Sequence, residues 1–259
     1  MLLTCVIRND TILFGFMREG DLMGHAAIGT DLHRTKDEYA VVVKELFAFY
    51  GFAPSDFDSA IFASVVPPLT EVIREAIQLL LGVRAHLIGS GIKTGLTILT
   101  ENPAELGGDL VASAVGALTK YTPPFVILDF GTAISFSMID AKGAYLGCAI
   151  TTGVRLSAAA LSDAAELLYH TASTLPKSVI GKTTSESLRC GSIFGTASMI
   201  DGMISRIEDA MGTPVTVIAS GAEADAVLPF CKREIQKDDT LLFYGLFSIY
   251  ERNRRPKKN

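Results

Sequence analysis

The order of strand-like and helical segments runs twice through the 259-residue chain. Each half opens with two apolar segments separated by a short polar turn, continues with a third strand-like segment, and then alternates helix, strand and helix. The first half begins with residues 2–7 and 11–17, and the second begins with "FVILDFGTAISFSMID", residues 125–140. A chain that repeats one α/β order is expected to form two similar units. We therefore predict two domains, residues 1–118 and 119–259.

Further segments follow from apolar periodicity and from glycine and proline breaks. Apolar residues recur at helical spacing in residues 35–51, and the strand at 59–66 ends at Pro67 and Pro68. The other expected helices are 69–82, 105–120, 153–170, 185–211 and 239–253, and the other expected strands are 21–29, 85–89, 143–150 and 216–221. Two such units are expected to leave a cleft between them, and ligands of such folds gather in a cleft of this kind.

Composition and charge restrict the kind of partner. The formal net charge is −5, which argues against nucleic acid or an anionic membrane as the main partner. No apolar run is long enough to span a membrane, and no signal peptide begins the sequence. The four cysteines lie far apart without metal-ligand spacing, so we read them as buried free thiols in a reducing compartment. These features predict a cytoplasmic protein without a nucleic-acid or membrane partner.

The tetrapeptide "DFGT", residues 129–132, is the most informative local motif. Asp129 ends an apolar strand, Gly131 lets a ligand approach the backbone, and Thr132 adds a hydroxyl. This combination suits a phosphate or a cation. A tight hairpin with an Asx-type turn would explain the same residues. The tetrapeptide alone does not decide between these two interpretations.

Two further motifs have a structural and a functional interpretation. In "ELGGDLVAS", Asp109 stands at the start of an expected helix, where a carboxylate is either a cap or first-turn charge or a general base. In "IASGAEAD", Gly221 either marks a turn that faces a ligand or relieves crowding. Both alternatives stay open on the residues alone.

The segment "GKTTSESLRCG", residues 181–191, is not a P-loop. The complete motif needs a glycine five residues before Gly181, and Pro176 stands there. Thr183, Thr184 and Ser185 are better explained as the cap of the helix that follows.

The first hairpin lacks two groups that a phosphate-binding hairpin of this shape normally has. Such a hairpin places an acid at the end of its first strand and a glycine in its turn, whereas this chain has Val6 and Arg8. Val6 cannot bind Mg²⁺, and Arg8 puts a bulky cation where the backbone would have to approach the ligand closely. Asn9 and Thr11 remain as hydrogen-bonding groups.

Short segments over nearly the whole chain carry a resemblance to a known family. They are "TD" (30–31), "RTKDEY" (34–39), "SVVPPLT" (64–70), "GIKTGL" (91–96), "NP" (102–103), "GGDL" (107–110), "DFGTA" (129–133), "GCAITTG" (147–153), "IGKTTSES" (180–187), "IASGA" (218–222) and "LFSIYERN" (246–253). In order and spacing they resemble the type III pantothenate kinases, which belong to the superfamily of acetate and sugar kinases, heat-shock chaperones and actin.

The resemblance implies a duplicated ribonuclease-H-like (actin-like ATPase) fold of two similar domains. It implies transfer of the γ-phosphoryl group of ATP to pantothenate, the first step of coenzyme A biosynthesis. Mg²⁺ and a monovalent cation, K⁺ or NH₄⁺, are implied as cofactors with ATP. The implied assembly is a homodimer with the substrate site near its interface.

The resemblance also assigns roles to individual residues. Asp109 resembles the general base for the pantothenate hydroxyl, Asp129 the monovalent-cation ligand and Thr132 an ATP contact. The implied substrate-binding residues are Gly107, Gly108, Asp109, Leu110 and Thr184, and the implied ATP-binding residues are Asn9, Asp10, Thr11, Gly131, Thr132 and Gly221.

The departures from the family pattern leave the activity open. The family's Asp-x-Gly-Asn-Thr is replaced by residues 6–10, "VIRND", and its Gly-Ala-Asp-Arg ends here in Leu110. The organising acid, the turn glycine and a substrate arginine are therefore lost. The sequence predicts a pantothenate kinase whose activity is impaired by this loss. A catalytically inactive paralogue that binds ligand or regulates a partner, and a kinase for another small hydroxylated acceptor, are the alternatives.

Overall fold

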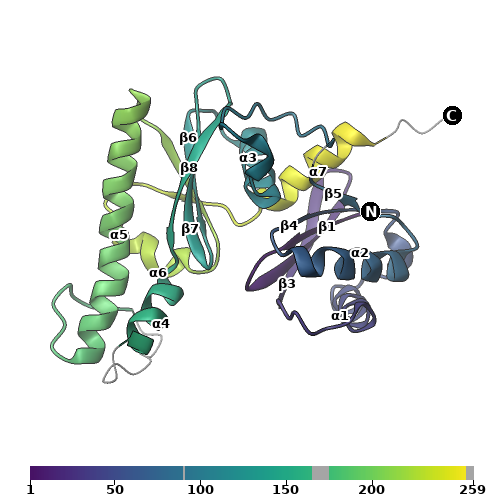
Figure 1. The fold of residues 1–259 in the computed structure, drawn as a ribbon, viewed down its shortest axis with the longest axis horizontal. Coiled ribbons are helices and arrows are strands. Elements are labelled where there is room, and N and C mark those ends of the chain that lie inside the picture. The colour runs from purple at the N-terminus through teal and green to yellow at the C-terminus, as the bar shows by residue number, and fades with distance from the viewer. Residues whose placement is uncertain (90, 165–174, 255–259) are drawn as a thin grey trace. The chain divides into compact units, whose positions relative to one another are not determined.

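The computed structural model describes residues 1–89, 91–164 and 175–254 of the chain (Figure 1). The chain forms two compact units. Unit 1 comprises Met1–Tyr121 and the C-terminal segment from Thr240, and unit 2 comprises Thr122–Asp239. The predicted division at 118/119 differs from this arrangement, because the helix over 241–253 packs in unit 1 and not in the second half.

Unit 1 is built on a five-stranded mixed sheet in the order β3-β2-β1-β4-β5. The first three strands are antiparallel, and β4 and β5 continue the sheet parallel to β1. The strands are β1 (Leu2–Ile7), β2 (Thr11–Arg18), β3 (Asp21–Gly29), β4 (Ser59–Ser64) and β5 (His86–Leu87), and the helices are α1 (Lys36–Phe49), α2 (Pro67–Leu81), α3 (Gly108–Lys120) and α7 (Leu241–Asn253).

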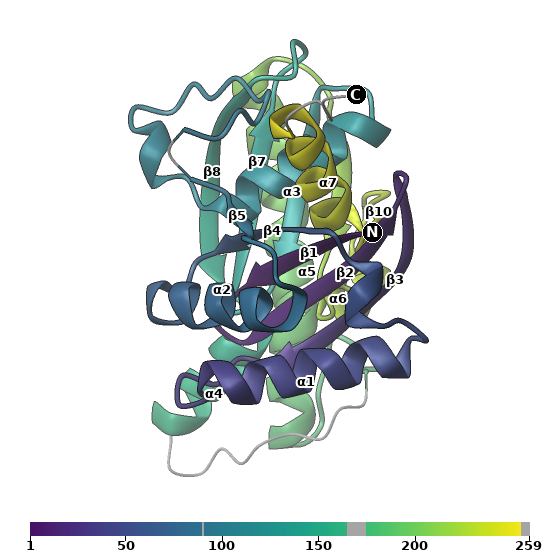
Figure 2. The same cartoon turned by 90° about the vertical axis from the view of Figure 1, so that its right-hand side faces the viewer.

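Helices cover both faces of this sheet, with α1 and α2 on one face and α3 and α7 on the other (Figure 2). Strand β1 is buried at every position. Its side chains alternate between the two faces, so Leu3 and Cys5 belong to the core under α1 and α2, whereas Leu2 and Val6 belong to the core under α3 and α7. A strand buried on both faces is expected to be continuously apolar, as its sequence is.

Unit 2 repeats the strand order of unit 1. Its sheet runs β10-β9-β6-β7-β8, with an antiparallel pair on each side of β7 and parallel pairing from β6 through β9 to β10. The strands are β6 (Phe125–Phe130), β7 (Ala133–Ile139), β8 (Tyr145–Thr152), β9 (Thr216–Ser220) and β10 (Gln236–Lys237), and the helices are α4 (Val154–Ala164), α5 (Thr184–Met211) and α6 (Ala224–Val227). The predicted duplicated α/β fold is therefore confirmed.

The long helix α5 covers the sheet of unit 2 with one apolar stripe. Its buried isoleucines and Ala197 recur every three or four residues and pack on residues of β6, β7 and β9; the stripe consists of Ile193, Ala197, Ile200, Ile204 and Ile207. Thr183 is the N-cap of α5, and its hydroxyl accepts a hydrogen bond of 3.2 Å from the amide of Glu186. The predicted capping function of this segment is confirmed.

Several predictions of local structure need correction. The helix expected over 105–120 is a 3-10 turn at Pro103–Glu105 followed by α3, because Leu106 has an extended backbone that interrupts the helical path. Strand β10 was not predicted, since two residues carry no periodicity. The helix expected over 153–170 is α4 up to residue 164, and the rest lies outside the described residues. Cys148 is exposed, and Cys231 is only partly buried, so the expectation of four buried thiols was wrong for these two.

The contact between α3 and α7 is a backbone-to-backbone approach at two glycines (Figure 2). A Cβ on Gly116 would lie 1.9 Å from the carbonyl oxygen of Leu241, and a Cβ on Gly245 would lie 1.8 Å from that of Ala112. Glycine is unfavourable inside a helix, so its presence at both positions is explained by this close crossing.

We predict that Gly245→Ala destabilises the protein because the methyl group would push α7 away from α3. The expected loss in the free energy of unfolding is roughly 1–3 kcal/mol or more. Gly195→Ala on α5 is the matched control: no atom lies within 4 Å of its added Cβ, so a gain of about 1 kcal/mol is expected. Urea unfolding of both variants checks this, and equal stability of the two would contradict the close crossing.

Candidate active site

The turn between β1 and β2 is formed without glycine. The strands pair as far as Ile7 and Ile12, and the amide of Arg8 donates a 2.9 Å hydrogen bond to the carbonyl of Thr11. Among the described residues, Glu19 is the only non-glycine residue with a positive φ, so Arg8 has an ordinary backbone conformation. The exchange of the family glycine for Arg8 therefore costs no backbone strain.

Val6 is a core residue. It is fully buried and belongs to the apolar cluster that joins β1 and β4 to α3 and α7, next to Ala63, Ile88 and Val111. The family pattern has an acid at this position, and this chain has an apolar side chain there. The hairpin therefore offers Mg²⁺ no ligand at position 6.

Thr30 fastens the tip of this hairpin to the end of β3. Its amide donates to the carbonyl of Asp10 at 3.0 Å, and its hydroxyl donates to the carbonyl of Arg8 at 2.6 Å. Both ends of the turn are thereby fixed, and the side chain of Arg8 starts from a well-defined backbone position.

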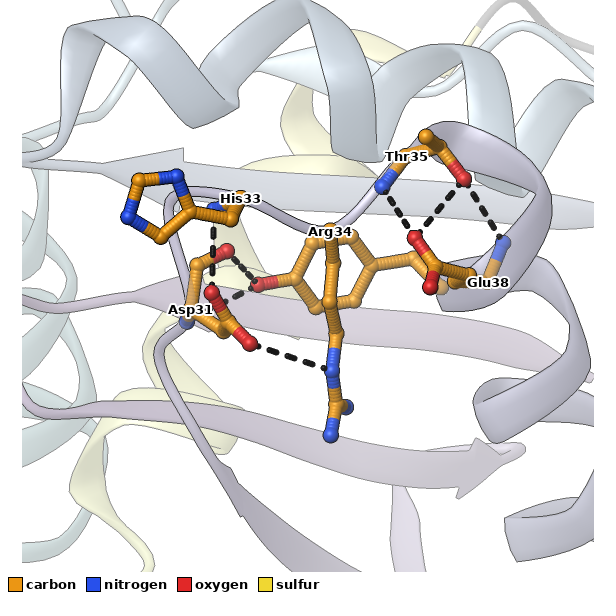
Figure 3. A network of polar contacts seen from close by, with 6 residues as sticks. Asp31, His33, Arg34, Thr35 and Glu38 are labelled. Carbon is orange, nitrogen blue, oxygen red and sulfur yellow. Dashed lines mark hydrogen bonds and ion pairs between the residues drawn. The ribbon is translucent and has the colours of Figure 1, made fainter.

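The next residue, Asp31, links this anchor to helix α1 (Figure 3). The hydroxyl of Tyr39 donates to the Asp31 carbonyl at 2.7 Å and accepts from the Asp31 amide at 3.1 Å. The Asp31 carboxylate accepts from the amide of His33 at 2.9 Å and lies 3.6 Å from Nε of Arg34.

A capping box then fixes the start of α1. Thr35 is the N-cap, its hydroxyl accepts from the Glu38 amide, and the Glu38 carboxylate accepts from the Thr35 amide at 2.7 Å (Figure 3). These hydrogen bonds from Thr35 lower the pKa of Glu38. The hairpin tip, the end of β3 and the start of α1 thus form one connected polar network.

Asp109 lies in the first turn of α3, whose N-cap is Gly107. Asp109 is therefore a first-turn carboxylate, and the interpretation of this residue as the helix cap was wrong. Its Oδ1 accepts a 2.9 Å hydrogen bond from the amide of Leu110. A Cβ on Gly107 would lie 2.6 Å from the same oxygen, so the glycine makes room for the carboxylate.

The guanidinium of Arg8 meets the carboxylate of Asp109. Arg8 Nε lies 3.9 Å from Asp109 Oδ2, and the two side chains are only 12% and 14% exposed. Arg8, which stands where the family pattern has glycine, therefore lies next to Asp109, the predicted general base. Sequence analysis singled out both residues but not their contact.

In unit 2, Asp129 pairs with a serine that sequence analysis missed. Asp129 lies opposite Ser220 in the parallel ladder of β6 and β9, and the Ser220 hydroxyl donates to Asp129 Oδ1 at 3.1 Å. Both side chains are buried. The available signal was the position of Ser220 as the last residue of its strand, because this residue pairs with Asp129 near the end of β6 once the two strands are aligned.

Two glycines let the backbone around Thr132 approach closely. A Cβ on Gly153 would lie 2.1 Å from the carbonyl oxygen of Gly131, and a Cβ on Gly221 would lie 2.0 Å from that of Phe130. Gly221 also has a φ of +103°, which favours glycine. The Gly153 amide donates to the Thr132 carbonyl at 2.9 Å. The crowding interpretation of Gly221 is correct, and it coexists with a turn at the end of β9.

The turn at Gly221 is also fixed by charged residues of unit 2. The Gly221 amide donates to Asp239 Oδ1 at 2.9 Å. Lys237 bridges Asp225 at 2.6 Å and Asp239 at 3.0 Å, and these contacts raise the pKa of Lys237.

Thr184 lines a separate cavity of unit 2, about 540 Å³ in volume. The cavity lies among β8, α4 and α5. Its polar lining consists mainly of hydroxyl groups, those of Thr151, Thr152, Ser157, Thr184, Ser187, Ser192 and Thr196. Such a lining suits a small ligand with several hydrogen-bonding groups.

The described residues hold neither a ready-made metal cluster nor a membrane-spanning helix. Residues 1–89, 91–164 and 175–254 contain no group of three or more His, Cys, Asp or Glu side chains that could hold a metal ion. In the same part of the chain, no helix is both long enough and apolar enough to cross a membrane.

Comparison with known proteins decides the family. The model of the type III pantothenate kinase family matches residues 2–206. Type III pantothenate kinases of Anaeromyxobacter dehalogenans and Brevibacillus brevis are 36% and 37% identical over 254 residues, which cover 98% of this chain and all of each relative. The chain belongs to the type III pantothenate kinase family. Members of this family are ATP-dependent kinases.

Solved structures agree with this family's fold. The activator of 2-hydroxyisocaproyl-CoA dehydratase from Clostridium difficile, solved with bound ADPNP, has a TM-score of 0.56 at 11% identity and covers 100% of this chain and 99% of its own. The ROK hexokinase of Thermus thermophilus has a TM-score of 0.53 at 12% identity, covering 98% and 99%. At these identities the likeness concerns the fold alone.

The residues predicted for a type III pantothenate kinase site lie at four places. Unit 1 carries Asn9, Asp10 and Thr11 at the hairpin and residues 107–110 at the start of α3. Unit 2 carries Asp129, Gly131, Thr132 and Gly221 at the ends of β6 and β9, and Thr184 in the hydroxyl-lined cavity. Sequence analysis did not single out Thr30 and Ser220, because their hydrogen-bond partners are distant in sequence.

Proposed function

We propose that this chain is an ATP:pantothenate phosphotransferase that acts in the first step of coenzyme A biosynthesis. One observation carries the proposal: a largely buried carboxylate, Asp109, is held in a fixed position at the start of α3 in a chain whose family is shown. The amide of Leu110 fixes one oxygen of this carboxylate. Asp109 Oδ2 is the oxygen nearer the Arg8 guanidinium.

In the proposed reaction, Asp109 orients the primary hydroxyl of pantothenate. As the hydroxyl oxygen bonds to the γ-phosphorus of ATP, the bond from that phosphorus to the bridging oxygen breaks and ADP leaves. Asp109 accepts the hydroxyl proton during this step. Residues 107–110 form the acceptor loop around it.

For the nucleotide, we propose the glycine-rich ends of β6 and β9 in unit 2. Gly131 and Gly221, in the turns that follow β6 and β9, are the proposed contacts of the phosphate chain, and the Thr132 hydroxyl adds a hydrogen bond. Asp129, with Ser220 beside it, is proposed as the monovalent-cation ligand. The hairpin residues Asn9, Asp10 and Thr11 are the proposed ATP contacts of unit 1, and Thr184 is a proposed acceptor contact.

Mg²⁺ enters this proposal with the substrate, as MgATP. Position 6 is occupied by the fully buried Val6 and not by a carboxylate. The hairpin therefore does not fit the family's metal-organising role, and we assign no step to a metal ligand there.

The function is tested by replacing Asp109. With saturating MgATP and K⁺, Asp109→Asn is expected to lower kcat for pantothenate phosphorylation by roughly 10²–10⁴-fold, because an amide cannot accept the proton. Coupled detection of ADP gives the rate.

Asp37→Asn is the matched control for this variant. Asp37 is also a first-turn carboxylate, at the start of α1, so both variants lose the same favourable interaction with a helix N-terminus. Only Asp109→Asn is expected to lose turnover. A wild-type protein without any pantothenate-dependent turnover would overturn the proposed function.

We further predict that Gly107→Ala inactivates the kinase while Gly108→Ala does not. A methyl group added at position 107 would displace the Asp109 carboxylate, from which its carbon would lie 2.6 Å, and a displacement of about 1 Å costs roughly 10²-fold in rate. At position 108 the nearest atoms, on Ile88 and Ala63, are 3.2 and 3.3 Å away, and the family has alanine there. Steady-state rates of the two variants decide, and similar rates would argue against this role of Gly107.

We also propose that the protein is a homodimer. Strand β8 is an edge strand of unit 2, and Leu146 and Ile150 on one of its faces are 37% and 65% exposed. Exposed Leu156 and Leu161 on α4 add to the apolar surface of the unit. An exposed apolar edge strand is a common place for a second chain to bind.

We predict that Ile150→Glu dissociates this dimer by burying a charge in the interface. Analytical ultracentrifugation is expected to give twice the 27.7 kDa chain mass for the wild type and the single mass for the variant. Phe49→Glu on α1, where Phe49 is 83% exposed, is the control and keeps the wild-type mass. A monomeric wild type at micromolar concentration would refute the dimer.

A further inference from the structure

The tip of the first hairpin, residues 8–11, is held by a residue outside the hairpin. The ladder between β1 and β2 ends before this tip. Thr30, the residue after β3, donates from its hydroxyl to the Arg8 carbonyl at 2.6 Å and from its amide to the Asp10 carbonyl at 3.0 Å. These two hydrogen bonds fix the backbone on both sides of Asn9, which is exposed.

Thr30 is itself anchored to the core of unit 1 through the next residue, Asp31 (Figure 3). The Tyr39 hydroxyl donates to the Asp31 carbonyl at 2.7 Å and accepts from the Asp31 amide at 3.1 Å. The Tyr39 side chain is fully buried in the core under α1 and α2. Two consecutive residues thus connect a buried ring with the tip of the hairpin.

The tip that is held in this way carries the proposed ATP contacts of unit 1, Asn9, Asp10 and Thr11. Two of them are also linked to each other, because the Thr11 hydroxyl donates to Asp10 Oδ1 at 3.2 Å. A short polar turn without such ties would have to be ordered when the nucleotide binds, and the lost entropy would weaken binding. A turn that is held in advance avoids this cost.

We propose that Thr30 is a positioning residue for the nucleotide, whose hydroxyl holds the hairpin tip in the conformation that binds ATP. This inference rests on the nucleotide site of the proposed function. Thr30 acts through the backbone of Arg8 and Asp10 and not through a contact of its own with the nucleotide. Its role is therefore measured as nucleotide affinity.

The test measures the binding of the non-hydrolysable ATP analogue ADPNP, with Mg²⁺, by isothermal titration calorimetry. Thr30→Val keeps the shape of the side chain and removes the hydroxyl. It is expected to raise the Kd roughly 3–10-fold, as the loss of one hydrogen bond of ordinary strength does. Thr30→Ser keeps the hydroxyl and is expected to have the wild-type Kd. In steady-state kinetics, the KM for MgATP is expected to rise by a similar factor in Thr30→Val, with kcat nearly unchanged.

Thr119→Val, near the C-terminal end of α3, is the matched control. The Thr119 hydroxyl also donates to a backbone carbonyl, that of Gly116, at 2.7 Å. This variant loses the same kind of hydrogen bond at a place that carries no proposed ligand contact, so its Kd for ADPNP is expected to equal that of the wild type. Urea unfolding measures the stability of both valine variants, so that a loss of affinity can be separated from a loss of stability.

A wild-type Kd in Thr30→Val would overturn the inference. An equal rise of the Kd in Thr30→Val and Thr30→Ser, or in Thr30→Val and Thr119→Val, would overturn it as well. If Thr30→Val does not fold, which circular dichroism reveals, Tyr39→Phe tests the same anchor from its buried end. A raised Kd in Tyr39→Phe then supports the inference, and a wild-type Kd refutes it.

Failure of the proposed function gives a different result. A wild type that binds ADPNP but does not phosphorylate pantothenate would overturn the proposed function alone, because the comparison of Kd values does not depend on turnover. A wild type that does not bind ADPNP would overturn both.

Discussion

The burial of β1 on both faces is the constraint on which unit 1 depends. Because helices cover both faces of the sheet, each side chain of this central strand must be accommodated in one of two cores. Val6 satisfies this requirement at the position where the family has an acid, next to Val111 of α3. Val6 is an apolar member of this core, and its side chain has no group that could bind a metal. Arg8 follows this strand directly in the hairpin turn, so the two departures from the family pattern lie in one short segment.

The electrostatics of the hairpin change sign as a result. A carboxylate that would attract a metal ion is absent, and a guanidinium stands two residues further on, against Asp109. Thr30 holds this arrangement by bonding to the backbone on both sides of Asn9, and Asp31 connects it to α1. Unit 2 carries Asp129 near the end of β6, with Ser220 beside it.

Much of the fold could be predicted from local pattern, and the errors have physical causes. The long periodic helices and the hairpins at the start of each half were predicted, as was the cap at Thr183. Two-residue strands such as β10 have no periodicity to detect. The 3-10 turn before α3 interrupts a segment whose composition is helical. Helix α7 packs in unit 1, where Gly116 and Gly245 allow its backbone to approach that of α3 closely. This contact could not be predicted from the sequence, because the two glycines are far apart in the chain. Ser220 and Thr30 were missed for a similar reason. Ser220 meets Asp129 through the register of β6 and β9, and Thr30 meets Arg8 because the end of β3 lies beside the first hairpin.

The sequence by itself determined the family, the duplicated order of strands and helices, and the chemical groups available: Asp109 as an acid after two glycines, Asp129 at the end of a strand, and Arg8 in place of a glycine. Motif order and apolar periodicity are local properties, and they can be read along the chain. Only the tertiary structure decided that Val6 belongs to the core, that Ser220 bonds to Asp129, and that Arg8 meets Asp109. Each of these depends on the packing of segments that are far apart in the chain, because side-chain contacts are set by how strands pair and helices cross.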